Sequence, residues 1–143
     1  MENNRETLIF VDDEPEILDI LSDIFAPENY AILTAQTGKQ AFELLRTGPV
    51  DLILCDLKLP DASGLEIIRT AKTFHPDVKA ILTTGYFDPS ESMVENQGKI
   101  IDRVLFKPWD IAMLRREVKG LLKQNGKKRQ EKPVDSKRET TGL

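Results

Sequence analysis

The sequence predicts an α/β fold in which a doubly wound, five-stranded parallel sheet is covered by five helices. Five short apolar runs alternate along the chain with segments whose apolar residues recur at helical spacing. Most of the runs are continuously apolar, which is typical of strands that are buried on both faces of a parallel sheet. The regular alternation of strand and helix favours right-handed β-α-β units.

The expected elements follow one another in order. The strands cover residues 8–11, 31–33, 52–55, 78–82 and 100–106. The helices cover residues 15–25, 38–46, 64–74, 89–98 and 109–122. Pro15 suits the first turn of the first helix, where a backbone N–H has no helical partner. His75 precedes Pro76, which disfavours helical backbone at the histidine, so the third helix is expected to end there. The fourth helix has the weakest pattern, because only Met93 and Val94 are apolar.

Composition places the chain among soluble, cytoplasmic, single-domain proteins. Its 143 residues suit one domain with one core. Cys55 is the only cysteine, so an internal disulfide framework is excluded. No apolar stretch reaches the roughly 20 residues of a membrane span, and the first residues lack a signal-peptide pattern. The net charge of −4 argues against a protein built mainly to bind nucleic acid or an anionic membrane.

The last part of the chain differs from the rest in charge and hydrophobicity. Residues 123–143 hold seven Lys or Arg and three Asp or Glu, and their large apolar residues are Val134 and Leu143. Such a segment buries too little apolar surface to offset the entropy lost on ordering. We therefore predict a folded domain over residues 1–122 and a basic, disordered tail or linker over residues 123–143. A solvated linker is favoured over a nucleic-acid contact.

Reactive polar residues follow four of the five expected strands. Asp12 and Asp13 follow the first strand, Asp56 the third, Thr84 the fourth and Lys107 the fifth. Because functional residues of doubly wound sheets gather beyond the carboxyl ends of the strands, these side chains are expected to converge on one edge. Each of these strand-end residues, taken alone, is also typical of a helix N-cap or a turn. Their joint occurrence indicates a functional site.

The convergent acids indicate a Mg²⁺-dependent phosphoryl-transfer site. Carboxylates packed together repel one another, and Mg²⁺ accepts a few carboxylate oxygens together with waters. A carboxylate is also a nucleophile toward phosphorus. Asp56 follows the middle strand and is the predicted nucleophile, with Asp12 and Asp13 as metal ligands. Lys107 and the Thr84 hydroxyl are expected to bind phosphoryl oxygens.

Four segments of the chain resemble the response-regulator receiver domain of two-component, phosphorelay signalling, as found in chemotaxis regulators. The segments are residues 8–14, 56–64, 82–86 and 106–109, and the resemblance covers roughly residues 6–122. It implies a flavodoxin-like sheet with the strand order 2-1-3-4-5. It also implies a phosphoprotein that switches through an aspartyl phosphate and is not a turnover enzyme.

The resemblance assigns a role to each site residue. Asp56 resembles the phosphoacceptor of the family, and Asp12 and Asp13 resemble its acidic metal pair, with Asp13 the direct ligand. The backbone carbonyl of Lys58 resembles the third protein ligand of the Mg²⁺ ion. Two further residues complete the set: Thr84 resembles the switch hydroxyl, and Lys107 resembles the family lysine, followed by Pro108 through a cis peptide bond.

The resemblance also implies partners. The phosphoryl donor would be a histidine kinase or a phosphotransfer protein, and the output would be a downstream protein target, with no membrane and no nucleic acid bound by this domain. A dimer through the face of the fourth helix, fifth strand and fifth helix is one possible assembly. Many receivers carry Tyr or Phe three residues before the lysine, whereas this chain has Val104, which predicts a muted or rerouted signal. Tyr86 is expected to flank the phosphoryl group and to slow the entry of water.

Three other function classes remain open. A haloacid-dehalogenase-like phosphatase carries a second acid two residues after its nucleophilic Asp, where this chain has Lys58. A flavin- or nucleotide-binding protein of flavodoxin type needs a phosphate-binding loop after the first strand, where Asp12 and Asp13 would repel phosphate without a metal. A scaffold that keeps the fold without phosphorylation has no need of the complete acidic set.

Overall fold

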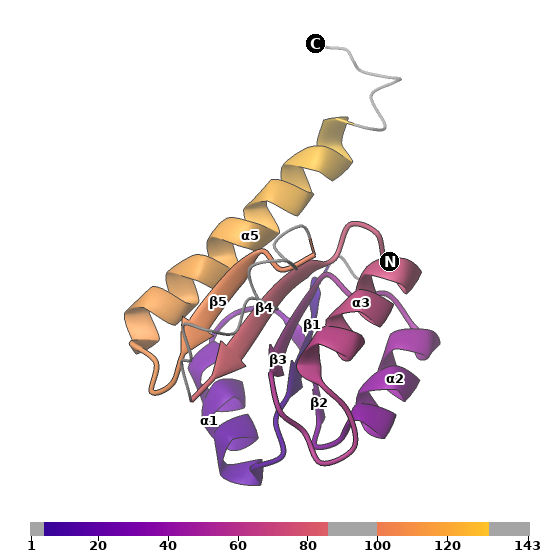
Figure 1. Ribbon diagram of the computed structural model, residues 1–143. Coiled ribbons are helices and arrows are strands. Elements are labelled where there is room, and N and C mark those ends of the chain that lie inside the picture. Colours follow the sequence, from indigo (N-terminus) through magenta and orange to yellow (C-terminus); the bar gives the residue numbers. More distant parts are fainter. Residues whose placement is uncertain (1–4, 86–99, 132–143) are drawn as a thin grey trace.

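A computed structural model describes the backbone of residues 5–85 and 100–131, with side chains as far as residue 124. It shows a five-stranded parallel sheet in the order β2-β1-β3-β4-β5, with helices on both faces (Figure 1). The predicted fold class and strand order are therefore confirmed. The strands are β1 (Thr7–Val11), β2 (Ala31–Ala35), β3 (Leu52–Asp56), β4 (Lys79–Thr84) and β5 (Arg103–Phe106). The described helices are α1 (Pro15–Phe25), α2 (Gly38–Thr47), α3 (Gly64–Phe74) and α5 (Ile111–Glu131).

Two apolar cores lie on opposite faces of the sheet. In β1, Ile9 and Val11 point into one core, and Leu8 and Phe10 point into the other. Helices α2 and α3 cover the first core, and α1 and α5 cover the second (Figure 1). Successive residues of a strand point to opposite faces, so burial on both faces requires a continuously apolar strand. This is why the runs in the sequence lack alternation.

The helix ends follow local sequence signals. Pro15 occupies the first turn of α1. Ser63 caps α3 and forms a capping box with Glu66. His75 ends α3 with non-helical backbone angles, φ −133° and ψ 81°, as the following proline predicts. The expected bounds of α1 and α3 match the observed ones for this reason.

The carboxyl end of α5 differs from the expectation. The helix continues to Glu131, so residues 123–131, which were expected to be disordered, are helical. Lys, Arg, Gln and Glu are good helix formers, and extending an existing helix requires no new nucleus. Residues 132–143 lie outside the described residues, so the division at residues 122 and 123 stays a prediction.

Two further expectations concern segments near the carboxyl half. Strand β5 begins at Arg103, not at residue 100. Just before it, the Asp102 N–H donates a hydrogen bond to the Ala80 carbonyl of β4, and this bond marks where the pairing with β4 starts. The helix expected over residues 89–98 lies outside the described residues, as does Tyr86. Among the helices that the structure describes, none is long and apolar enough to cross a membrane.

Candidate functional site

The register of the sheet brings the ends of β1 and β3 together. Val11 pairs with Cys55 in the parallel ladder, so Asp12 and Asp56, the next residue on each chain segment, lie at the same level. The residues two positions earlier, Phe10 and Leu54, belong to the core beneath α1 and α5. By alternation, both carboxylates are expected on that same side of the sheet. Two acids far apart in sequence thus become neighbours.

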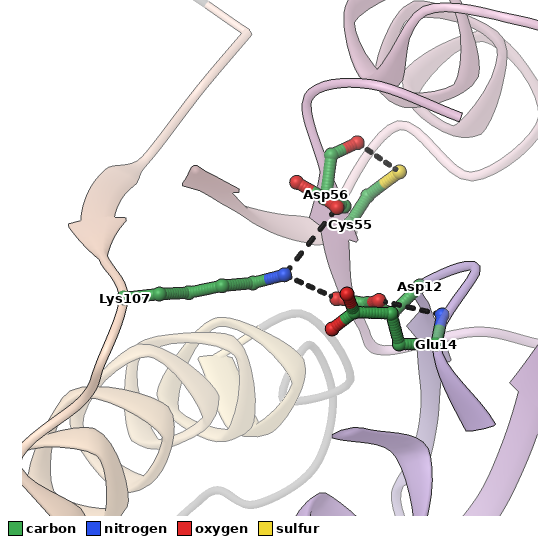
Figure 2. Close-up of polar contacts among 5 residues, drawn as sticks. All are labelled: Asp12, Glu14, Cys55, Asp56 and Lys107. Carbon is green, nitrogen blue, oxygen red and sulfur yellow. Dashed lines mark hydrogen bonds and ion pairs between the residues drawn. The ribbon is translucent and has the colours of Figure 1, made fainter. Parts of the chain in front are cut away.

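Lys107 reaches across the sheet edge to both acids (Figure 2). Its Nζ lies 2.6 Å from Asp12 Oδ2 and 3.3 Å from Asp56 Oδ2. Asp12 is only 1% exposed, and its Oδ1 accepts a hydrogen bond of 2.9 Å from the Glu14 N–H. Both oxygens of Asp12 are therefore engaged, and one ammonium group bridges two carboxylates.

The electrostatics of the site favour charge on the lysine more than on Asp56. Burial raises the pKa of Asp56, and the charge of Asp12 raises it too, while the Lys107 charge lowers it; the net pKa lies above the usual 3.8. Burial lowers the pKa of Lys107, but the hydrogen bond and charge of Asp12, with those of Asp56, outweigh this, and its pKa is raised. Because the acids outnumber this lysine, the site retains excess negative charge.

The acids fit a hard divalent cation. Asp12, Asp13 and Asp56 each offer one carboxylate oxygen, and these three oxygens lie within 4.8 Å of one another. An all-oxygen donor set of this kind suits Mg²⁺, which keeps several waters in its coordination shell. Asp13 is exposed, so a cation held by its carboxylate would remain open to water and to a phosphoryl oxygen. The three carboxylates among the predicted metal ligands are thus close together, while the role of the Lys58 carbonyl stays a prediction.

The structure places Thr84 at the end of β4, buried and paired with Phe106 of β5. Its carbonyl accepts a hydrogen bond of 2.9 Å from the Lys107 N–H. Strand alternation puts Thr84 on the side of Leu82, whose core lies beneath α2 and α3. Val104, half-buried, packs against that same core. Thr84 is thus linked to Lys107 through the backbone.

Cys55 precedes the central acid and is fully buried, as expected of a small core residue. Burial raises the pKa of its thiol far above the usual range, with smaller contributions from Asp56 and Asp12. Its Sγ donates a hydrogen bond of 3.3 Å to the Asp56 carbonyl (Figure 2). The thiol is therefore held neutral and packed, and it takes no part in the acid cluster.

Two residues near the site were not singled out from the sequence. Thr83 pairs with Asp56, is fully buried, and its hydroxyl has no hydrogen-bond partner within the described residues. Strand alternation was the signal that could have found it, because it puts Thr83 on the same side of the sheet as Asp56. Asp61 accepts hydrogen bonds from two backbone N–H groups of α2. No sequence signal indicates that contact, because Asp61 follows no strand end and belongs to no pattern that places it beside α2.

Comparisons with known sequences agree with this geometry. A family model for the response regulator receiver domain matches residues 8–119. The chain is 31% identical over 134 residues to response regulator protein PilR of Pseudomonas aeruginosa, covering 94% of this chain and 30% of PilR. It is 30% identical over 119 residues to sporulation initiation phosphotransferase F of Bacillus subtilis, covering 82% of this chain and 94% of that protein. The chain thus spans under a third of PilR and nearly all of the phosphotransferase.

Solved structures of response regulators have the same fold as this chain. A CheY-like receiver domain from Methanospirillum hungatei has a TM-score of 0.80 at 29% identity, covering 87% of this chain and 99% of that one. Response regulator TrrA from Thermotoga maritima, solved in complex with Mg²⁺-BeF, has a TM-score of 0.71 at 31% identity, covering 81% and 98%. The chain belongs to the response regulator receiver domain family of two-component systems, whose members are phosphoacceptor signalling domains and not turnover enzymes.

Proposed function

We propose that this chain accepts a phosphoryl group on Asp56 from a histidine kinase or a phosphotransfer protein, in a Mg²⁺-dependent reaction, and thereby switches a protein-interaction surface. The observation that carries the proposal is the bridge from Lys107 to two carboxylates inside a cluster of three acids. The cluster has more negative charge than one lysine neutralises. A divalent cation would neutralise the excess and, with Lys107, would offset the negative charge of a phosphoryl group.

In the proposed reaction, a carboxylate oxygen of Asp56 attacks the phosphorus of a phosphohistidine. The new O–P bond forms as the P–N bond breaks, and the imidazole leaves with the bonding electron pair. Lys107 lies 3.3 Å from Asp56 Oδ2, so its charge favours the ionised nucleophile and is in reach of the transferred group. The partial burial of Asp56 limits the access of water to the product.

Asp13, Asp56 and the backbone carbonyl of Lys58 would hold the Mg²⁺ ion. The ion would supply positive charge next to a phosphoryl oxygen, which phosphoryl transfer requires. Asp12 would add charge to the cation site and hold Lys107, since its own oxygens already accept from Lys107 and from the Glu14 N–H. The exposure of Asp13 supports its role as the direct ligand.

The proposed output passes through β4 and β5. By alternation Thr84 starts on the other side of the sheet from Asp56, so its hydroxyl would have to move toward the phosphoryl group to donate to one of its oxygens. Its backbone is bonded to Lys107. Thr84 also pairs with Phe106, which is 44% exposed at the edge of the sheet. Strand β5 is therefore the described element next to the switch. A dimer through the fourth helix, β5 and α5 stays a prediction, because the fourth helix lies outside the described residues.

The test is reaction of the protein with acetyl phosphate and Mg²⁺, followed by intact mass. We expect one added phosphoryl group in the wild type, none in Asp56→Asn, and none when EDTA removes the cation. Asp19→Asn, which removes an exposed charge from α1, serves as the control and should react normally. A phosphorylated Asp56→Asn protein, or a wild type that never reacts, would contradict the proposal.

A further inference from the structure

The segment after Asp56 forms a small closed hairpin. The Gly64 N–H donates to the Leu57 carbonyl at 2.7 Å, and the Leu59 N–H donates to the Ala62 carbonyl at 3.2 Å. Lys58 and Ser63 face each other between these two bonds as an antiparallel bridge. In such a pair, flanked by hydrogen bonds but not joined by them, the backbone N–H and C=O point away from the partner strand. The Lys58 carbonyl therefore points away from the opposite strand of the hairpin, which carries Ser63.

The tip of this hairpin is fastened to the beginning of α2. Asp61 Oδ1 accepts a hydrogen bond of 2.7 Å from the Gly38 N–H, and Oδ2 accepts one of 3.0 Å from the Lys39 N–H. Thr37 Oγ1 accepts from the Gln40 N–H at 3.1 Å, as an ordinary N-cap. Two of the N–H groups that a helix leaves without intrahelical partners are thus bound by a carboxylate from another element.

Two glycines show how closely these segments approach. A Cβ at Gly38 would lie 2.6 Å from Ala62 Cβ and 3.1 Å from Asp61 Oδ1. A Cβ at Gly64 would clash with the Asp56 carbonyl oxygen. One end of the hairpin is therefore in contact with α2, and the other is in contact with the backbone of Asp56.

We infer that Asp61 is a positioning residue for the acid site: by binding the first turn of α2, it fixes the hairpin that carries the Lys58 carbonyl. The inference rests on the proposed function, in which that carbonyl is a metal ligand. A carboxylate that accepts two backbone N–H bonds at a helix N-terminus gains from charge assistance and from the helix dipole. The same bonds lower the pKa of Asp61, so the carboxylate stays charged at neutral pH.

The main experiment measures Mg²⁺ affinity by titration, followed by the fluorescence of Trp109, the only tryptophan. We expect Asp61→Ala to weaken Mg²⁺ binding about tenfold, the effect typical of residues that orient metal ligands. Asp61→Asn should give a smaller loss, because its amide oxygen accepts from one N–H while its amide nitrogen faces the other. The reaction rate with acetyl phosphate at subsaturating Mg²⁺ should fall in parallel.

Two matched variants distinguish the effect of the hairpin's position from the effect of the Asp61 charge. Gly38→Ala keeps the Asp61 charge but forces α2 away from the hairpin, so it should also weaken Mg²⁺ binding. Asp19→Asn removes the same charge from an exposed site on α1 and should leave the affinity unchanged. If Asp61→Asn and Asp19→Asn weakened binding equally while Gly38→Ala did not, the effect would be one of charge, and the inference would be wrong.

A metal-free measurement distinguishes this inference from the proposed function. Hydrogen exchange at the Leu59 and Gly64 amides reports the closed hairpin directly, and we expect faster exchange at both in Asp61→Ala without Mg²⁺. Unchanged exchange, or an unchanged Mg²⁺ affinity in the folded variant, would overturn the inference. A wild type that binds no Mg²⁺ would instead refute the proposed function, and with it the link from the hairpin to the metal.

Discussion

Aspartates lie at both edges of the sheet, and their surroundings differ. At the amino edge, Asp51 Oδ2 accepts from the Thr7 N–H at 2.8 Å, and Asp102 Oδ2 accepts from the Ala80 N–H at 2.8 Å and from Lys72 Nζ at 3.1 Å. These carboxylates bind donors at the start of neighbouring strands. At the carboxyl edge, Asp12 and Asp56 lie close to each other and share Lys107.

The contrast shows what the same residue type does in two settings. A carboxylate that binds backbone N–H groups satisfies donors that would otherwise be buried without partners, and this stabilises the fold. Burial and the charge of Asp12 raise the pKa of Asp56 in spite of the Lys107 that the two acids share, so the charge on Asp56 costs free energy of folding. The amino edge therefore holds the sheet together, and the carboxyl edge gives up stability to form a binding site.

Truncation of an amino-edge carboxylate should have the largest effect on stability. Asp102→Ala leaves the Ala80 N–H without its acceptor. Among the described residues, Lys72 Nζ keeps the Val78 carbonyl, 2.6 Å away, as a hydrogen-bond partner. We expect a loss of about 2 kcal/mol in the free energy of unfolding, measured by urea denaturation. Asp102→Asn keeps an acceptor for the N–H and should lose less. An Asp102→Ala protein as stable as the wild type would remove the contrast.

Mg²⁺ should stabilise the carboxyl edge selectively. At a concentration tenfold above its dissociation constant, a ligand that binds only the folded state adds about 1.4 kcal/mol. We expect a corresponding rise in Tm for the wild type and for Asp102→Asn, whose acid cluster is intact. Asp13→Asn should show little or no rise. An equal rise in Asp13→Asn would mean that the cation binds elsewhere.

Neutralising the central acid should raise stability, in the direction opposite to Asp102→Ala. Asp56→Asn relieves burial of a charge and its repulsion from Asp12, while Lys107 keeps Asp12 as a partner. Without Mg²⁺ near neutral pH, we expect a gain on the order of 1 kcal/mol, or roughly 3 °C in Tm. Lower stability in Asp56→Asn would show that the ion pair with Lys107 outweighs the cost of burial.

The smallest expected effect is the pH dependence of the stability that Asp56→Asn gains over the wild type. The pKa of Asp56 is higher in the folded protein than the usual 3.8, so the folded state holds its proton to higher pH than the unfolded state does. As pH rises from below 3.8, the wild type loses stability relative to Asp56→Asn until the raised pKa is passed. Urea denaturation over a pH series should show the gain appear and then level off. A gain that shrinks with rising pH has the wrong sign for this explanation.

The sequence by itself determined the order of the described strands and helices and the ends of α1 and α3, but not the start of β5 or the end of α5. Strand burial follows from the continuous apolar runs, because alternating side chains must then meet a core on each face. The ends of α1 and α3 follow from Pro15, Ser63 and His75, whose effects are local. Even the grouping of acids and lysine at one edge follows from strand order alone, because parallel strands share their carboxyl edge.

Only the tertiary structure decided how those residues meet. The bonds from Lys107 to Asp12 and Asp56 join residues 95 and 51 positions apart, so they depend on register and on which face each side chain takes. The contact of Asp61 with α2 arises where a loop happens to approach a helix, and no local pattern encodes it. Local signals fix backbone conformation, whereas distances between remote side chains are set by the packing of the whole sheet.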